Sequence, residues 1–173
     1  MHTKVVYQGA KGLVRAGCAV LRFNFRGVGR SDGTFDSGEG ERADFRAALD
    51  YMAARYPSLP LWSAGFSFGA WVALETGADD DRVSVLIGVA PPVATSVSGE
   101  AYEFPRTRVS TKPKFFVQGE ADEVCPLQAL WAFYGTLEEP KELVVIDAAD
   151  HLFEGKAAEV GEALEDLLKD FEP

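Results

Sequence analysis

A serine between two glycines is the feature of this sequence best suited to chemistry. The pentapeptide Gly65-Phe66-Ser67-Phe68-Gly69 has the form G-x-S-x-G and lies where a predicted strand ends and a predicted helix begins. A sharp strand-to-helix turn strains the serine backbone and lifts its hydroxyl clear of the sheet, while flanking glycines remove side chains that would clash. The Phe68 backbone N–H points at the same place and can stabilise developing negative charge. The sequence therefore predicts Ser67 as a nucleophile and Phe68 as an oxyanion-hole donor, the alternative being a turn without chemistry.

A neutral serine needs a base within hydrogen-bond reach, and the chain contains two histidines. His2 lies ahead of the first predicted helix, whereas His151 follows a predicted strand at residues 143–146. Loops at the carboxyl ends of parallel strands lie along one edge of the sheet, so we expect Ser67 and His151 to meet there. His151 is the predicted base, the alternative being an ordinary surface histidine.

The third group needed is a carboxylate that orients the histidine and stabilises its charged form. Glu120, Asp122 and Glu123 follow a predicted strand at residues 113–118, and spacing does not choose among them. Asp150 directly precedes the histidine, but adjacent residues on an extended loop usually point apart. With an acid from the first group, the order serine, acid, histidine is that of α/β-hydrolases and differs from the orders in chymotrypsin and subtilisin.

Apolar periodicity places these residues on strands that alternate with helices. Strands are predicted at residues 18–25, 61–66, 83–89, 113–118 and 143–146, and helices at residues 68–76 and about 126–136. Further helices are predicted from three apolar faces: Val6, Ala10, Leu13 and Val14, ending at Gly17; Phe45, Ala48, Leu49 and Met52, ending before Pro57; and Val160, Leu164, Leu167, Leu168 and Phe171. The alternation indicates an α/β fold with a mostly parallel sheet flanked by helices on both faces, forming a single domain over residues 1–173. Residues 93–112 are expected to form a surface excursion.

Four stretches in a fixed order carry a resemblance to a known family. They are residues 22–31 (RFNFRGVGRS), 64–70 (AGFSFGA), 119–126 (GEADEVCP) and 149–153 (ADHLF). Together they resemble the small dienelactone-hydrolase-like serine esterases of bacteria, within the α/β-hydrolase superfamily. The family pattern G-x-x-D-x-x-V-P implies Asp122 as the acid and places Cys125 where relatives have valine. Serine at position 67 differs from the cysteine of dienelactone hydrolases proper and from the aspartate of haloalkane dehalogenases.

The resemblance also implies polypeptide that this sequence does not contain. Relatives carry further strands ahead of the first helix, one of them inside the sheet between the strands equivalent to 18–25 and 61–66. A His- and Gly-rich loop there supplies a second oxyanion N–H. The explanations are a misassigned start codon, which we favour, a truncated remnant, or flanking strands that close the gap directly. Because loss of one oxyanion donor costs roughly 10²–10³ in turnover, the short form is expected to be a weak catalyst.

Composition and charge limit the classes of partner that the chain is expected to bind. The 173 residues carry a net charge of −10, with a pI near 4.7, which disfavours binding to nucleic acid or to anionic membranes. No apolar run reaches the ~20 residues of a membrane helix, and the start does not read as a secretory signal. Cys18, expected to be a buried thiol, and Cys125 lack metal-ligand spacing, so we expect a cytoplasmic protein without metal or organic cofactor.

The predicted function is hydrolysis of small, soluble carboxylic esters through an acyl-enzyme on Ser67. A non-catalytic relative of this fold is one alternative, and a thioesterase or peptidase that uses the same triad is another.

Overall fold

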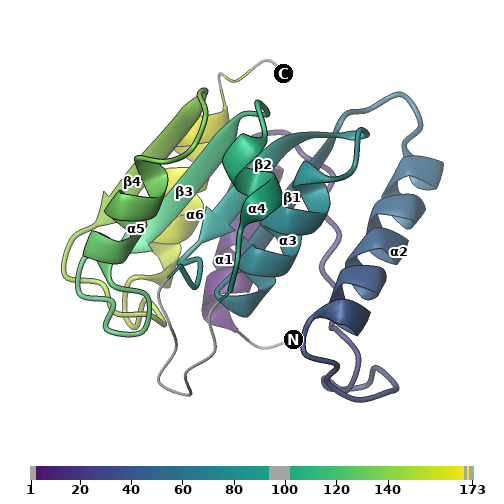
Figure 1. Cartoon of the computed structure of the whole chain (residues 1–173), viewed down its shortest axis with the longest axis horizontal. Helices are drawn as coiled ribbons and strands as arrows, with labels where there is room; N and C mark the ends of the chain where they lie inside the picture. The colour runs from purple at the N-terminus through teal and green to yellow at the C-terminus, as the bar shows by residue number, and fades with distance from the viewer. Residues whose placement is uncertain (1–2, 94–101, 170, 172–173) are drawn as a thin grey trace.

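The computed structural model describes residues 3–93, 102–169 and 171, and its centre is a four-stranded parallel sheet (Figure 1). Across the sheet the strands lie in the order β1 (Leu61–Phe66), β2 (Val83–Val89), β3 (Lys114–Gly119) and β4 (Lys141–Ile146). The helices are α1 (Lys4–Arg15), α2 (Glu39–Arg55), α3 (Phe68–Ala78), α4 (Pro105–Val109), α5 (Leu127–Tyr134) and α6 (Ala157–Leu168). Helices α3, α4 and α5 form the crossovers that consecutive parallel strands require. The predicted α/β fold is confirmed.

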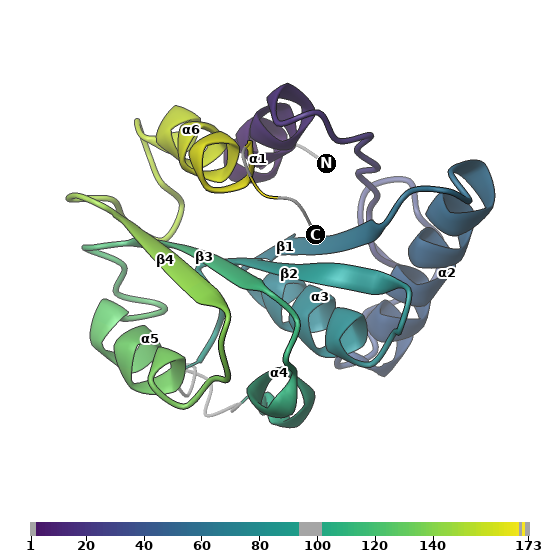
Figure 2. The same ribbon diagram turned by 90° about the horizontal axis from the view of Figure 1, so that it is seen from above.

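Helices cover both faces of the sheet (Figure 2). Helices α1 and α6 lie side by side on one face, and α3, α4 and α5 lie on the other, with α2 beside α3 near β1. Strand β2 packs against both layers, because Val85 and Ile87 belong to the core on the α6 side and Leu86 belongs to the core on the α3 side. A strand buried on both faces is apolar at nearly every position, which is why its pattern is continuous rather than alternating. Within the described parts of the chain, no helix combines the length and apolarity needed to cross a membrane.

Most element boundaries agree with the periodicity, and β1 and β2 have the bounds that it predicts. Gly17 follows α1 with φ 92°, the left-handed conformation expected of a residue that ends a helix. The expected surface excursion at 93–112 is partly wrong, because it contains α4 and the buried side chain of Phe104. Helix α4 is hydrogen-bonded to α3, because the backbone N–H and the hydroxyl of Thr107 both donate to Oε1 of Glu75 in α3, over 2.9 and 2.7 Å. Residues 94–101 lie outside the described residues.

The prediction of a strand at residues 18–25 is wrong. The backbone there has no regular secondary structure and is not part of the sheet, and β1 is the sheet's edge on that side. Among the residues that the structure describes, the N–H groups from Ala19 to Phe25 have no protein acceptor. Apolar cavities separate this segment from β1, so the two do not close the gap directly. Cys18, at the start of the segment, is only partly buried, contrary to the expectation of a buried thiol.

The apolar face predicted for α1 is also only partly correct. Its buried residues are Val5, Gly9, Gly12 and Leu13. The glycines let α1 approach α6 closely: a Cβ on Gly12 would lie 2.0 Å from the carbonyl oxygen of Gly161. Val14 is 57% exposed, while Val6 and Ala10 are partly buried and line the cavity beside β1. Packing against α6 therefore sets the buried face, and part of the predicted apolar stripe faces the gap in the sheet.

Candidate active site

The turn between β1 and α3 holds Ser67 in a strained backbone conformation. Its φ of 52° and ψ of −125° lie in a region that residues with a side chain rarely adopt. The Ser67 N–H donates to the Val89 carbonyl over 2.9 Å, and the Ser67 carbonyl accepts from the Ala70 N–H over 2.8 Å, so the turn is tied to β2 and to α3. Phe68 is the first residue of α3, and its N–H therefore has no acceptor within the helix. The strand-turn-helix context predicted for the pentapeptide is present.

The two glycines of the pentapeptide differ in how much space a side chain would have at their positions. A Cβ on Gly65 would lie 2.0 Å from the Gly69 carbonyl oxygen and 2.3 Å from its carbonyl carbon. A Cβ on Gly69 would meet only the Phe25 ring, at an ordinary 3.8 Å. The expectation that both glycines remove a clash is therefore correct for Gly65 and wrong for Gly69.

Ser67, His151 and Asp122 form a chain of hydrogen bonds. Ser67 Oγ lies 2.9 Å from His151 Nε2, and His151 Nδ1 lies 2.9 Å from Asp122 Oδ2. The three residues follow β1, β4 and β3, so they meet at the carboxyl edge of the sheet as predicted. The Asp122 side chain is fully buried, and that of His151 is 15% exposed. A proton on Nδ1, donated to the carboxylate, leaves the Nε2 lone pair free to accept the serine hydroxyl.

The other candidate carboxylates take different places. Glu120 Oε2 accepts a backbone N–H from the loop that carries His151, over 2.9 Å. Asp150 Oδ1 accepts a backbone N–H four residues further along the same loop, over 2.9 Å, and Glu123 is exposed. Of the four acidic candidates, Asp122 is the one that contacts the imidazole. His2 lies outside the described residues.

Four donors surround the Asp122 carboxylate. Oδ1 accepts the backbone N–H groups of Val124 and Cys125 over 2.9 and 2.7 Å. Oδ2 accepts Gln118 Nε2 over 2.9 Å in addition to His151. These bonds compensate the carboxylate for its burial. Gln118 also donates to the Cys125 carbonyl over 2.7 Å, which closes the loop around the acid.

Sequence reasoning missed Gln118, although a signal was present. It is a polar residue near the end of the otherwise apolar run Phe115 to Val117, and it is fully buried. A buried amide in such a strand requires partners for its polar atoms, and its position four residues before Asp122 makes that acid a possible partner.

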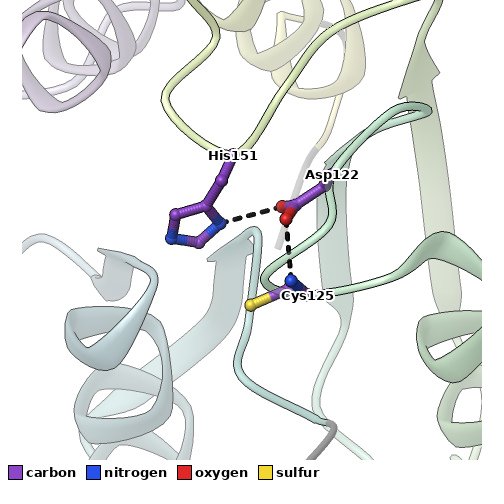
Figure 3. Close-up of side chains that lie close together, drawn as sticks. All are labelled: Asp122, Cys125 and His151. Atoms are coloured by element: carbon purple, nitrogen blue, oxygen red, sulfur yellow. Dashed lines mark hydrogen bonds and ion pairs between the residues drawn. The ribbon is translucent and has the colours of Figure 1, made fainter. Parts of the chain in front are cut away.

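Asp122, Cys125 and His151 lie close enough to raise the possibility of a metal site (Figure 3). One ligand atom from each lies within 4.8 Å of the others. Burial and the charge of Asp122 raise the pKa of the Cys125 thiol to about 12, so this sulfur remains protonated near neutral pH and is a poor metal ligand. Both carboxylate oxygens already accept two hydrogen bonds each. The donor set therefore favours a proton relay over a metal centre.

Aromatic packing and backbone contacts hold His151 in place. The Phe66 ring lies against the imidazole, with centroids 5.3 Å apart and planes tilted by 32°, and Phe153 packs on Phe66 at 6.4 Å. The loop contains two non-glycine residues with positive φ, Ala148 at 49° and Phe153 at 52°. The bond from Glu120 ties this loop to the one that carries the acid. These contacts orient the base before any substrate arrives.

An apolar cavity of about 650 Å³ opens beside Ser67. Apart from Ser67, its polar side chains come from Thr3, Arg22 and Asn24, and none of its described lining residues is acidic. The Phe25 and Phe68 rings meet edge to face in this wall, with centroids 6.0 Å apart. The described lining is thus mostly apolar, with one cationic side chain and no carboxylate.

Comparison with known proteins gives consistent results. The family model described as serine aminopeptidase, S33, matches residues 1–107. An α/β serine hydrolase homologue from Coxiella burnetii is 39% identical, with a TM-score of 0.87 over 97% of this chain and 77% of that one. A lidless α/β serine hydrolase from Xanthomonas campestris is 37% identical, with a TM-score of 0.86 over 100% of this chain and 77% of that one. Protein RP471 of Rickettsia prowazekii is 36% identical over 174 residues, which span 97% of this chain and 72% of that protein.

The family match includes the strand-turn-helix segment that carries Ser67, and the structural matches extend over nearly the whole chain. The chain therefore belongs to the α/β serine hydrolases, in the family described as serine aminopeptidase, S33.

Proposed function

We propose that this chain hydrolyses carboxylic esters of small, uncharged or anionic substrates through an acyl-enzyme on Ser67. The observation that carries the proposal is the continuous chain of 2.9 Å contacts from the Ser67 hydroxyl through His151 to Asp122. Family membership establishes a serine hydrolase; the ester substrate and the roles of the individual residues are what we add to it.

In the acylation half-reaction, Ser67 Oγ attacks the ester carbonyl carbon and its proton moves to His151 Nε2. Asp122 stabilises the resulting imidazolium through the bond to Nδ1. The oxyanion that develops on the carbonyl oxygen accepts the Phe68 N–H at the start of α3. Collapse of this intermediate breaks the bond to the alcohol oxygen, which takes the proton from His151 as it leaves.

In the deacylation half-reaction, water takes the place of the alcohol. His151 Nε2 accepts a proton from the water as its oxygen attacks the acyl carbon. The bond to Ser67 Oγ then breaks, the proton returns to the serine, and the carboxylic acid leaves. The chain's own residues thus account for every proton that moves.

The lining of the cavity favours an ester over the N-terminus of a peptide. An aminopeptidase must bind the α-ammonium group of its substrate, for which a carboxylate is the natural partner. The described lining beside Ser67 contains Arg22 and no acidic side chain. The net charge of −10 also favours a small-molecule substrate over nucleic acid. We therefore place esters ahead of amides with a free amino terminus.

Intact-mass analysis after treatment with a fluorophosphonate tests the nucleophile. The parent chain should gain a single adduct and Ser67→Ala none, while Ser84→Ala, a control serine on β2, should label like the parent. Turnover of p-nitrophenyl acetate should follow the same pattern. Equal labelling of Ser67→Ala, or no labelling of a folded parent chain, would exclude the proposed role.

Substrate comparison tests the specificity. We expect p-nitrophenyl acetate to be turned over faster than leucine p-nitroanilide, which presents an amide and a free α-ammonium group. The reverse order would assign the site to peptide hydrolysis. A thioester of the same acyl group, run in parallel, separates an esterase from a thioesterase.

A further inference from the structure

Aromatic rings gather beside the residue that supplies the proposed oxyanion N–H. The Phe68 ring is at their centre, and its centroid lies 5.6–6.0 Å from those of Phe25, Phe35, Trp71 and Tyr102. Three of these four contacts, all except the one with Trp71, are edge to face. We refer to these five residues as the aromatic cluster. They come from four separate segments of the chain, so the cluster exists only in the folded molecule.

Phe35 is the member of the cluster that is open to solvent. It is 61% exposed, whereas the other four residues are partly buried. Its ring meets Phe68 at 5.6 Å with the planes inclined by 64°, so one side of Phe35 is occupied by the cluster and the rest is accessible. An exposed ring that continues a cluster beside a nucleophile is a surface on which an apolar ligand can bury itself.

The loop that carries Phe35 is held in place by hydrogen bonds. The N–H of Asp36, the next residue, donates to Oε1 of Glu41 over 3.0 Å. The N–H of Gly38 donates to Oε2 of the same carboxylate over 2.8 Å, and Glu41 is buried. The loop also packs directly on Trp71, because a Cβ on Gly38 would lie 2.4 Å from that ring. The position of Phe35 is therefore set before a ligand arrives, which lowers the entropy cost of binding.

The ester reaction brings one part of the substrate to this cluster, so the inference rests on the proposed function. In the tetrahedral intermediate the reacting carbon bears Ser67 Oγ, the oxyanion, the alcohol oxygen and the acyl group. The oxyanion accepts the Phe68 N–H, and the alcohol oxygen must lie within reach of His151 Nε2 to take its proton. The acyl group takes the remaining direction. Because the N–H and the ring of Phe68 belong to one residue, an acyl group larger than acetyl lies beside that ring.

We propose that Phe35 and Phe68 form an aryl subsite, and that the preferred substrates are esters whose acyl group carries a planar aromatic ring. Edge-to-face and offset-stacked contacts between rings stabilise a complex beyond the apolar area that they bury. An aliphatic acyl group of the same size gains the area alone. The accessible part of Phe35 supplies one such contact and Phe68 supplies another. Phe35 is thus a specificity-determining residue that the sequence pattern did not single out.

Two esters that differ only in aromaticity test the subsite. The substrates p-nitrophenyl phenylacetate and p-nitrophenyl cyclohexylacetate share a leaving group and a carbon skeleton. The readout is the ratio of their kcat/KM values, compared between variants so that intrinsic reactivity cancels. Phe35→Leu removes the ring and keeps an apolar side chain, and it should lower the aromatic-to-aliphatic ratio by about three- to tenfold. Phe35→Tyr, which keeps the ring, should stay within about twofold of the parent ratio.

Tyr51→Leu is the matched control. Tyr51 is 59% exposed on α2, close to the exposure of Phe35. The residue before it, Asp50, pairs at 2.8 Å with Arg82, which directly precedes β2 and so lies at the opposite edge of the sheet from Ser67. This variant should keep the parent ratio. An equal drop in Tyr51→Leu, or an unchanged ratio in folded Phe35→Leu, would overturn the aryl subsite while leaving ester hydrolysis in place.

Binding to a chain that cannot turn over separates this inference from the proposed function. In Ser67→Ala, phenylacetamide should bind about three- to tenfold more tightly than cyclohexylacetamide by ligand-observed NMR titration, and adding Phe35→Leu should remove the difference. That result from a parent chain that hydrolyses neither ester would support the subsite and refute ester hydrolysis. Equal binding of the two amides would refute the subsite. So would a parent chain that is dimeric in light scattering and becomes monomeric in Phe35→Leu, because the ring would then be a contact between copies.

Discussion

Replacing Asp122 with asparagine probes the relay with minimal change of shape. The parent carboxylate accepts four hydrogen bonds, two on each oxygen. An asparagine side chain has one accepting oxygen and one donating nitrogen, so it can satisfy only one of these pairs. If its NH₂ faced the backbone N–H groups of Val124 and Cys125, two buried donors would lose their acceptor, at about 1–3 kcal/mol each. The reverse orientation leaves only the Gln118 Nε2 donor without this acceptor, because His151 can carry its proton on Nε2 instead. We therefore expect the amide oxygen to take the two backbone bonds and the NH₂ to face His151.

That orientation forces the wrong tautomer on the base. With a donor opposite Nδ1, the imidazole of His151 must carry its proton on Nε2, which then donates to Ser67 and cannot accept its proton. A base locked in the wrong tautomer costs about 10⁴ in kcat in the Ser-His-Asp triad of serine proteases. We expect Asp122→Asn to slow turnover by about 10³–10⁴, which is roughly 4–5.5 kcal/mol of transition-state stabilisation.

The assay is the rate of fluorophosphonate labelling, with kcat/KM for p-nitrophenyl acetate as a second readout and urea unfolding as a check on folding. Glu123→Gln and Asp150→Asn are the matched controls, because they neutralise nearby exposed carboxylates. Both should label within about twofold of the parent. If Asp122→Asn retained a tenth of the parent rate while folded, or if a control lost as much, the assignment of Asp122 as the orienting acid would be wrong.

Three further predictions concern the same elements. Gly65→Ala should lower the free energy of unfolding by about 3 kcal/mol in urea titrations, because its Cβ would lie 2.0 Å from the carbonyl oxygen of Gly69. Gly69→Ala should change the free energy of unfolding by less than about 1 kcal/mol. Equal losses for the two variants would contradict the proposed difference between the two glycines. Gln118→Met should slow fluorophosphonate labelling about tenfold without shifting KM for p-nitrophenyl acetate, since the carboxylate loses one donor; an unchanged rate would deny Gln118 a positioning role. The pKa of the Cys125 thiol is raised from about 9 to about 12, so its contribution to stability is full below pH 9 and is lost as pH rises from 9 to 12. Cys125→Val should flatten this alkaline loss in chemical unfolding at several pH values, and an identical pH profile would refute the burial argument.

The strands and helices that carry the site could be predicted because their signals are local. The apolar run at 61–66, the pentapeptide and the following helix form a strand-turn-helix unit whose requirements lie within a few residues of Ser67. The order of Ser67 and His151 along alternating strands and helices was then enough to place both at one edge of a parallel sheet.

The identity of the acid could not be predicted from local sequence features. Glu120, Asp122 and Glu123 lie within four residues of one another, and no periodicity distinguishes them. The folded loop turns Asp122 inward onto the donors of Gln118 and His151, while Glu120 binds the neighbouring loop. Which carboxylate meets the base depends on how two loops pack, and that contact joins residues far apart in the chain.

The sequence by itself determined the α/β class and most element boundaries, and it placed a serine and a histidine at one edge of the sheet. These features depend on side-chain periodicity and turn chemistry, which act over short distances along the chain. Only the tertiary structure decided that the apolar segment 18–25 is not a strand. A strand forms only where a neighbouring strand pairs with it, and a cavity separates this segment from β1. It likewise decided which face of α1 is buried, because close approach to α6 depends on Gly12 and Gly161 meeting across the helix pair. Pairing and packing are contacts between distant residues, and they arise only once the chain has folded.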